Sequence, residues 1–269
     1  MLDLSIIIIT WNAEQYVKKC LDSVLESTRK ISKEIIIIDN GSTDSTPQLL
    51  KEYQSEDFIL IFQNKNSGVA KARNTGLKMA QGKYLWILDI DTIVNERAIS
   101  GMLQFIEQEP SCGIVACKLK KSSGEIQNSC RRFPSLKYKI NNIMESVFGR
   151  FTFTQSLKQK IERKNREQFY KESMNSSTPF LVEYVIGACQ LIRKKAFEEV
   201  GLLDEKIFYG PEDADFCVRM RKKNWDIYYM PQFSIIHEYQ QMTSKKLFSR
   251  MSIIHTKALF YYFWKHKRF

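Results

Sequence analysis

The sequence has no cysteine pattern that indicates a zinc site or a disulfide framework. Its six cysteines include no Cys-x-x-Cys pair; they are Cys20, Cys112, Cys117, Cys130, Cys189 and Cys217. An apolar run begins within the first few residues of the chain, so we expect no targeting segment ahead of it. The cysteines are therefore predicted to be free thiols in the reducing cytoplasm.

Long apolar runs and glycine-rich phosphate loops are also missing. No apolar stretch approaches the roughly 20 residues that a membrane-spanning helix needs, so we expect at most a peripheral association with a membrane. No G-x-G-x-x-G and no G-x-x-x-x-G-K-[ST] pattern follows an apolar run. A dehydrogenase or a P-loop nucleotidase would therefore lack its phosphate cradle.

Acidic residues are scarce in two segments that carry the net charge of +11. Residues 131–171 hold eleven Lys or Arg against three acids, and residues 245–269 hold seven and no acid. These segments contribute +8 and +7, which leaves −4 for the remaining chain. A nucleic-acid-binding protein would carry basic charge across its folded core. The observed distribution instead favours an anionic membrane surface or a phosphorylated substrate as partner, and no nucleic acid.

Four short, strongly apolar runs alternate with helical patterns in the first hundred residues. Such runs, without polar alternation, are typical of strands buried on both faces of a parallel sheet. Short connections with right-handed crossovers place helices on both faces of that sheet. The predicted fold class is therefore α/β, with a mostly parallel, Rossmann-like sheet. The predicted strands are Leu4–Thr10, Glu34–Asp39, Phe58–Phe62 and Tyr84–Leu88.

Polar clusters follow each of these strands and are expected to meet at one edge of the sheet. Open α/β sheets bind their ligands at that edge. The last cluster, Asp89–Asp91 followed by Thr92, offers hard oxygen ligands that suit a diphosphate bound through Mg²⁺ or Mn²⁺. Acids that cap the following helix would give the same pattern, so this Asp-x-Asp is ambiguous by itself. The other clusters are Thr10–Glu14, Asp39–Asp44 and Asn64–Ser67.

A second group of acids lies between Tyr209 and Asp215. Acids at a helix N-terminus are ordinarily caps, favoured by the helix dipole. Three of them, preceded by Tyr-Gly-Pro, exceed what a cap needs, and Asp215 can pair with Arg219 one turn later. We therefore expect Glu212 and Asp213 to face a cleft, where a carboxylate can accept a proton from an incoming hydroxyl.

Two further features of the second half are compatible with a site. The stretch Val185–Cys189 contains Gly187 and Ala188, small residues at which another group is expected to approach closely. His237 ends a predicted strand that starts at Ile227 and is interrupted by a proline. A lone histidine is more often a structural residue than a metal ligand, so His237 carries little weight alone.

The two basic segments leave alternatives open. Residues 135–178 permit helices and are interpreted either as an insertion over the open face of the site or as a solvated helical surface. A basic amphipathic helix is expected in residues 241–269, where one face would carry Leu247, Met251, Ile254, Ala258 and Tyr261. This helix either lies in a membrane interface or packs on the domain.

In this order, the motifs resemble the family 2 glycosyltransferases, which are inverting nucleotide-sugar enzymes of the GT-A fold. The segments that carry the resemblance are Ile6–Asn12, Ile37–Asp44, Asn66–Gly76, Leu88–Asp91 and Glu212–Asp215. They cover about residues 1–100 and 180–240. Within the family the chain is most similar to bacterial rhamnosyltransferases of surface-polysaccharide assembly, through His237, Ser252 and the Tyr262–His266 end.

The resemblance implies roles for the matching residues. Asp89 and Asp91 would hold Mg²⁺ or Mn²⁺, with Asp91 the more direct ligand and His237 a second one, and Asp213 matches the catalytic base. Thr10, Asn12, Glu14 and Asp39 would contact the nucleoside, and Asn66 and Arg73 would lie near the ribose and diphosphate. The candidate substrate contacts are Gly187, Ala188, Tyr209 and Glu212.

The implied activity is transfer of a sugar from dTDP-rhamnose or a UDP-sugar to a saccharide on a polyprenyl diphosphate, at the inner face of the cell membrane. Absence of the Gln-x-x-Arg-Trp motif of processive synthases favours transfer of a single sugar. We expect residues 1–240 to form the catalytic domain, with a nucleotide-sugar half (1–110) and an acceptor half (111–240). The alternatives are a sugar nucleotidyltransferase, whose glycine-rich loop is missing, and a non-catalytic scaffold that retains the sheet.

Overall fold

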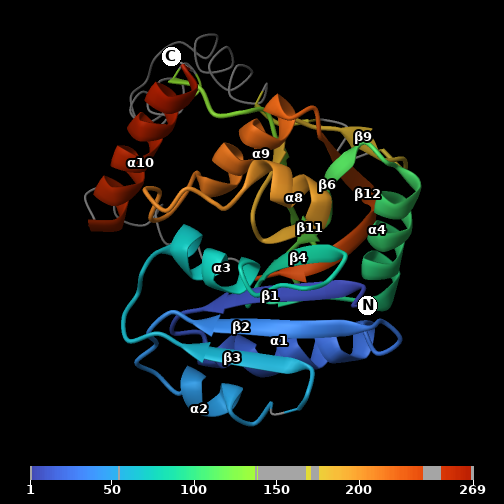
Figure 1. Cartoon of the computed structure of the whole chain (residues 1–269), viewed down its shortest axis with the longest axis vertical. Coiled ribbons are helices and arrows are strands. Elements are labelled where there is room, and N and C mark those ends of the chain that lie inside the picture. Colours follow the sequence, from blue (N-terminus) through green and yellow to red (C-terminus); the bar gives the residue numbers. More distant parts are fainter. Residues whose placement is uncertain are drawn as a thin grey trace.

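The computed structural model describes residues 2–53, 55–136, 138, 168–170, 176–238 and 250–267. Most of the segment interpreted as an insertion (135–178) lies outside the described residues, as do residues 239–249. Figure 1 shows the described elements arranged around one large central sheet.

The first part of the chain forms the predicted alternation of strands and helices. Its elements are β1 (Leu4–Thr10), α1 (Glu14–Ser27), β2 (Lys33–Asp39), α2 (Thr46–Leu50), β3 (Phe58–Phe62), α3 (Val69–Leu77) and β4 (Tyr84–Asp89). The four strands pair in parallel, in the spatial order β3-β2-β1-β4. The carboxyl ends of these strands therefore lie at the same edge of the sheet.

The second part of the chain extends this sheet with strands of both directions. Its elements are β5 (Thr92–Ile93), α4 (Glu96–Gln108), β6 (Cys112–Lys120), β7 (Ile126–Gln127), β8 (Cys130–Arg131), β9 (Phe180–Leu181), β10 (Tyr184–Val185), β11 (Cys189–Arg193), α8 (Lys194–Val200), α9 (Glu212–Lys222), β12 (Asp226–His237) and α10 (Arg250–His266). β11 lies antiparallel to β4 and β6, and β12 runs parallel to β6. β12 runs as one strand through Pro231, but the predicted interruption appears in its pairing with β6, whose register shifts between Met230 and Ser234.

Two hydrophobic cores lie on opposite faces of the sheet. Ile6 and Ile8 of β1 point to the face covered by α1 and α4, whereas Ile7 packs on the other face with α3. Helices α8, α9 and α10 also contribute side chains to this second core. The predicted α/β class, with a mostly parallel sheet and helices on both faces, is therefore confirmed.

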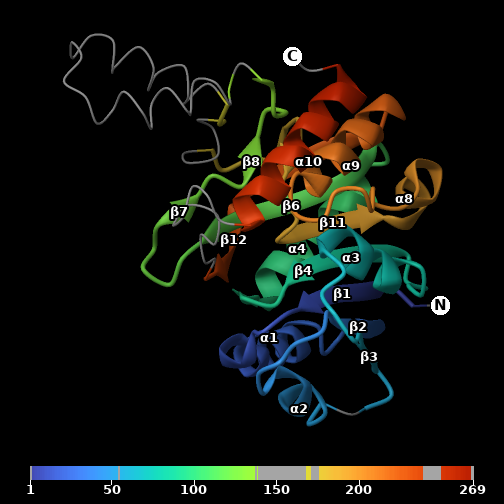
Figure 2. The same cartoon turned by 90° about the vertical axis from the view of Figure 1, so that its left-hand side faces the viewer.

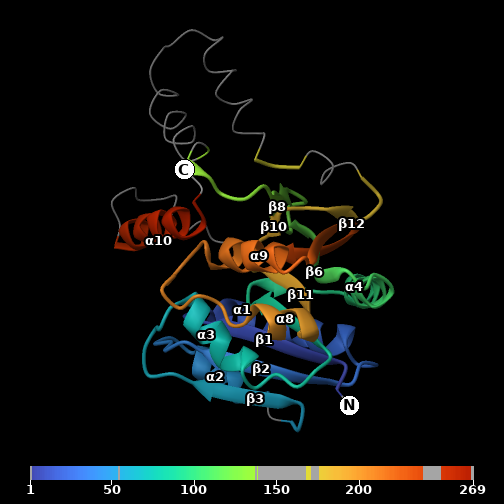
Figure 3. The same ribbon diagram turned by 45° about the horizontal axis from the view of Figure 1, so that its top comes forward.

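The C-terminal helix α10 packs beside α9, as Figure 2 and Figure 3 show. Tyr262 and Phe263 are buried in the second core. Asp215 of α9 is fully buried and lies 2.6 Å from Lys265 Nζ and 2.8 Å from His266 Nε2 of α10. One face of the helix therefore packs on the domain. Within the described part of the chain, no helix is both long and apolar enough to cross a membrane.

Replacing Asp215 with Asn is expected to destabilise the protein by about 3 kcal/mol, because Lys265 and Arg219 lose a buried counter-charge. Burial opposes ionisation of Asp215, but hydrogen bonds from His266 and Lys265 and the charge of Arg219 hold its pKa well below the usual range. Such a carboxyl stabilises the fold above its unfolded-state pKa of about 3.9, and this contribution disappears as the pH falls towards its lower folded-state pKa.

Thermal unfolding against pH measures this effect. The stability of the wild type should approach that of the variant on acidification and exceed it most at neutral pH. Glu96→Gln is the matched control, since Glu96 is exposed and pairs with an exposed lysine, so its loss should change the stability little. Equal effects of the two substitutions would contradict the assigned role of Asp215.

Candidate active site

A cleft of about 1830 Å³ opens at the edge of the sheet where the parallel strands end. Its walls include residues from the ends of β1, β4 and β12, the start of α9 and one face of α10. Twelve of the predicted site residues line it: Thr10, Asn12, Asn66, Arg73, Asp89, Asp91, Gly187, Ala188, Tyr209, Glu212, Asp213 and His237. Motifs that are far apart in the sequence therefore share one cleft.

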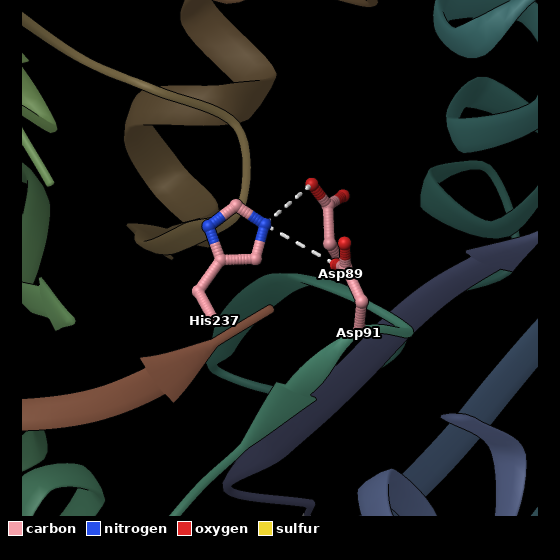
Figure 4. A group of neighbouring side chains, drawn as sticks. All are labelled: Asp89, Asp91 and His237. Atoms are coloured by element: carbon pink, nitrogen blue, oxygen red, sulfur yellow. Dashed lines mark ion pairs between the residues drawn. The ribbon is translucent and has the colours of Figure 1, made fainter. Parts of the chain in front are cut away.

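Asp89, Asp91 and His237 form a group that fits a divalent cation, as Figure 4 shows. One ligand atom from each residue lies within 4.8 Å of the others. His237 Nε2 is 3.2 Å from Asp91 Oδ1 and 4.0 Å from Asp89 Oδ2. β4 supplies Asp89, the turn after it supplies Asp91, and His237 closes β12. The carboxylate oxygens of Asp89 and Asp91 are the hard ligands predicted from the sequence, and His237 adds a nitrogen ligand.

The electrostatics of this group also favour a bound cation. Burial raises the pKa of Asp89, against the charge of Arg73, and the nearby charge of Asp91 raises it further. Burial would lower the pKa of His237, but its hydrogen bond to Asp91 and the charges of Asp91 and Asp89 raise it. Negative charge is thus concentrated on partly desolvated carboxylates, and a divalent cation would neutralise it.

Gln127 of β7 holds His237 from the side away from the carboxylates. His237 Nδ1 lies 2.7 Å from Gln127 Oε1. Because an amide oxygen only accepts hydrogen bonds, Nδ1 carries a proton. Nε2 donates to Asp91 while the ring is protonated, and it offers its lone pair to a cation once the ring is neutral. Sequence reasoning does not single out Gln127, since the contact depends on β7 pairing with β6 and β6 with β12.

Replacing Gln127 with Leu is expected to weaken Mn²⁺ binding by about 10- to 100-fold, because the imidazole of His237 loses the partner that orients it. Calorimetric titration of the protein with Mn²⁺ measures this directly. Asn128→Ala is the matched control, because Asn128 lines the same cleft. The backbone oxygen of Asn128, which the substitution retains, accepts the hydrogen bond from Arg131 Nε. An unchanged Mn²⁺ affinity in Gln127→Leu would rule out the orienting role.

Arg73 is buried, at 4% exposure, and links Asp89, one of the three candidate metal ligands, to α9. Its Nη2 donates to Asp89 Oδ1 at 2.7 Å and to the Gly187 carbonyl oxygen at 2.9 Å, while Nη1 donates to Glu212 Oε1 at 3.2 Å. A Cβ at Gly187 would lie 2.3 Å from Nη1, so any larger residue would displace the guanidinium. The close approach predicted at Gly187 is therefore made by a guanidinium, and these Arg73 donors are engaged by protein acceptors.

The three acids at the start of α9 have different environments. Asp215 faces α10, and its predicted pairing with Arg219 is present at 2.9 Å. Glu212 is 6% exposed and accepts from Arg73 and from a backbone N–H, and burial together with the charge of Asp213 raises its pKa to about 7. Asp213 is half-buried, and its Oδ2 accepts the Gly187 N–H at 3.1 Å. Of the three acids, Asp213 is the least buried, and its side chain lines the cleft.

The β1–α1 turn forms another part of the cleft. Thr10 Oγ1 is buried there without a hydrogen-bond partner, so it can serve a ligand. Asn12 Oδ1 accepts the Thr43 N–H at 2.8 Å, which ties the turn to the loop after β2. Trp11 lines the same wall and is 43% exposed. Sequence reasoning missed Trp11, although it lies inside the Thr10–Glu14 cluster, and its flat indole can stack on a base.

Two predicted nucleoside contacts do not reach the cleft wall. Asp39 is buried, and its Oδ2 accepts the Ser42 N–H at 3.0 Å. Glu14 Oε2 accepts the Ser45 N–H at 3.0 Å. Both carboxylates therefore hold the loop after β2 in shape beside the cleft.

Proteins with similar sequences and folds provide a context for this geometry. The sequence model described as glycosyl transferase family 2 matches residues 5–201. The N-acetylglucosaminyl-diphospho-decaprenol L-rhamnosyltransferase of Mycobacterium tuberculosis is 25% identical over 263 residues, a region that covers 94% of this chain and 81% of that protein. The rhamnosyltransferase WbbL of Escherichia coli is also 25% identical over 263 residues, with 96% and 91% covered.

The fold is shared with a solved glycosyltransferase structure. The mannosyltransferase PcManGT of Pyrobaculum calidifontis, in complex with GDP-Man and Mn²⁺, superposes with a TM-score of 0.59 at 17% sequence identity. The match covers 90% of this chain but only 60% of that chain. This likeness extends to the architecture, and at such low identity it carries no information on the substrate.

Proposed function

The chain belongs to glycosyl transferase family 2, and we propose that it transfers one sugar from a nucleotide-diphospho sugar to a saccharide acceptor, with inversion at the anomeric carbon. The observation that carries this proposal is a continuous hydrogen-bonded path from Asp213 to Asp89, one of the three candidate metal ligands. The Gly187 N–H donates to Asp213, the Gly187 carbonyl oxygen accepts from Arg73, and Arg73 donates to Asp89. Groups suited to the acceptor and to the leaving group are therefore held in one cleft.

Asp89, Asp91 and His237 are the residues that would hold the cation. When bound, a divalent ion neutralises the negative charge that develops on a nucleoside-diphosphate leaving group. Both carboxylates suit Mg²⁺ and Mn²⁺, whereas the imidazole nitrogen makes the set less purely oxygen than Mg²⁺ prefers. We therefore favour Mn²⁺. Arg73 fixes the orientation of Asp89, and Gln127 fixes that of His237.

Asp213 is the proposed general base. Its half-buried carboxylate lines the cleft, where it would accept the proton of the attacking acceptor hydroxyl. Attack on the face opposite the leaving group is a single displacement, so the anomeric configuration inverts. The hydrogen bond from the Gly187 N–H holds the carboxylate in position for this transfer.

We propose dTDP-rhamnose or a UDP-sugar as the donor, supported by two relatives that are named rhamnosyltransferases. Thr10, Asn12 and Trp11 would contact the nucleoside, and Asn66 the ribose. Asp39 and Glu14 would act by shaping the loop after β2. Gly187, Ala188, Tyr209 and Glu212 remain the proposed substrate contacts.

The proposed acceptor is a saccharide on a polyprenyl diphosphate, presented at the cytoplasmic face of a membrane. One relative carries N-acetylglucosaminyl-diphospho-decaprenol in its name, which supports this class. The proposed catalytic domain spans residues 1–240: the nucleotide-sugar half (1–110) supplies Asp89 and Asp91, and the acceptor half (111–240) supplies Asp213 and His237. Residues 241–269 would follow as the C-terminal segment, and its α10 packs on this domain.

Release of nucleoside diphosphate tests the proposed function without knowledge of the acceptor. The protein is incubated with a panel of dTDP- and UDP-sugars, in Mn²⁺ or in EDTA, and the released diphosphate is measured. We expect slow hydrolysis of donors that share one nucleotide, and no release in EDTA. Absence of release with every donor in Mn²⁺ would instead favour the non-catalytic scaffold.

A further inference from the structure

Helix α10 carries three of the most exposed large apolar side chains in the described structure. Ile253, Phe260 and Trp264 are 52%, 60% and 70% exposed. Their spacing of seven and four residues places them on one helix face, and Lys257, which is also exposed, falls on the same face between them. We call these four residues the outer stripe. Exposed apolar side chains aligned in this way mark an interaction surface.

The outer stripe is not the face expected from the sequence. Met251 and Ile254, on the expected apolar face, line the cleft, and Ala258 is buried against the domain. Leu247, the first residue of that expected face, lies outside the described residues. The helix thus has an inner face that packs on the domain and a separate outer stripe that the described part of the domain leaves exposed.

The segment that contains the outer stripe is basic in sequence. Residues 245–269 contain seven Lys or Arg and no acid. Lys265, on the flank of the helix, is paired with Asp204 and Asp215 of the domain. Lys257 and Lys267 are exposed beside the apolar side chains. A partner that covers this surface must therefore combine apolar and anionic groups.

We propose that the outer stripe is the surface through which the protein lies on an anionic lipid bilayer. Phe260 and Trp264 would enter the headgroup level, which aromatic side chains prefer, and Lys257 and Lys267 would meet anionic headgroups. A second copy of the chain fits this surface less well, because two identical basic surfaces would face each other.

This placement gives the cleft a defined position relative to the lipid, a consequence that rests on the proposed function. His255 and Leu259, on the inner face of α10, line the cleft together with Met251 and Ile254. α10 is therefore a wall between the cleft and the bilayer. A saccharide joined to a membrane-embedded diphosphate would enter the cleft beside this wall.

Vesicle flotation tests the proposal. Wild-type protein should float with vesicles that contain phosphatidylglycerol, and less with phosphatidylcholine alone or at high salt. The double variant Phe260→Ser/Trp264→Ser should lose about tenfold or more in partitioning. Met79→Ser, which replaces another exposed apolar side chain (41%) just after α3, should behave as the wild type. All substituted side chains are exposed, so thermal unfolding should be unchanged.

Tryptophan fluorescence gives a local readout. Quenching by brominated acyl chains should be strong in the wild type and should fall in Trp264→Phe, a variant that retains most vesicle binding. Equal flotation of wild type and double variant, or no flotation of either, overturns the proposal. The proposal is also overturned if the wild type is a dimer that binds no vesicles and the double variant is a monomer, since the outer stripe would then be a dimer interface.

Donor hydrolysis in the same preparations, without vesicles, separates this proposal from the proposed function. The double variant should hydrolyse donor at the wild-type rate, since the outer stripe does not line the cleft. Wild-type protein that hydrolyses donor but does not float contradicts only the lipid surface. Wild-type protein that floats without hydrolysing any donor supports the surface and contradicts the enzyme.

Discussion

Replacing Asp213 with Asn is expected to lower the rate of sugar transfer by about 10²- to 10⁴-fold, because an amide cannot take the proton of the acceptor hydroxyl. The amide oxygen can still accept the Gly187 N–H, so α9 and the Gly187 loop should stay in place. Affinity for the donor nucleotide should remain near the wild-type value. Single-turnover rates at saturating donor, together with calorimetric nucleotide affinity, separate the two quantities.

The control for this substitution is Asp22→Asn. Asp22 is an exposed acid on α1 that pairs with Lys18, and its loss should leave the transfer rate unchanged. Unimpaired transfer in Asp213→Asn would reject Asp213 as the base. A loss of nucleotide affinity as large as the loss of rate would assign Asp213 to donor binding instead.

Replacing Asp91 with Asn is expected to remove most of the Mn²⁺ affinity and, with it, metal-dependent donor binding. The substitution takes away one of the two carboxylates in the ligand group and half of its negative charge. Calorimetric titration with Mn²⁺ should show binding in the wild type and little or none in the variant. Donor hydrolysis in Mn²⁺ should fall to the level measured in EDTA.

Glu238→Gln provides the matched control for Asp91→Asn. Glu238 follows His237 directly, but its carboxylate accepts from Ser122, and only its backbone N–H contacts Asp91, at 2.9 Å from the backbone oxygen. The substitution therefore removes a negative charge close to the site without touching a ligand atom. If it reduced Mn²⁺ affinity as much as Asp91→Asn does, the effect would be long-range electrostatics and not ligation.

The parts of the site that follow parallel strands could be predicted from the sequence. Thr10 ends β1, and Asp89 ends β4. Because consecutive parallel strands end at the same edge, the order of apolar runs alone brings these residues together. Nothing more than strand direction is needed, so this prediction did not depend on any tertiary contact.

Contacts between distant elements could not be predicted in the same way. Gln127 meets His237 only through two strand pairings that no local pattern specifies. Arg73 was expected near the ribose and diphosphate, but the bonds of its guanidinium to Asp89, Gly187 and Glu212 were not predicted. These partners become visible only when α3, β11 and α9 are placed around the cleft.

The C-terminal helix illustrates a second limit. Ile253 and Ile254 are neighbours of equal hydrophobicity, yet Ile253 is exposed and Ile254 lines the cleft. Helical periodicity identifies apolar faces, but it does not decide which face packs on the domain. Here the inner face is held by the buried Tyr262 and Phe263 and by the ion pairs of Lys265 with Asp204 and Asp215. These contacts join residues about 50 to 60 positions apart in the chain, so no local pattern reveals them.

Thermal unfolding in the presence of nucleoside diphosphates tests the central claim most directly. The protein is unfolded with dTDP, UDP, GDP or ADP, each with Mn²⁺ and with EDTA. A ligand at a hundredfold excess over its dissociation constant stabilises the native state by about 2.7 kcal/mol. We predict a shift of this size with dTDP or UDP in Mn²⁺ and little shift in EDTA. No shift with any nucleotide, or equal shifts with and without Mn²⁺, would contradict a metal-held nucleotide-sugar site.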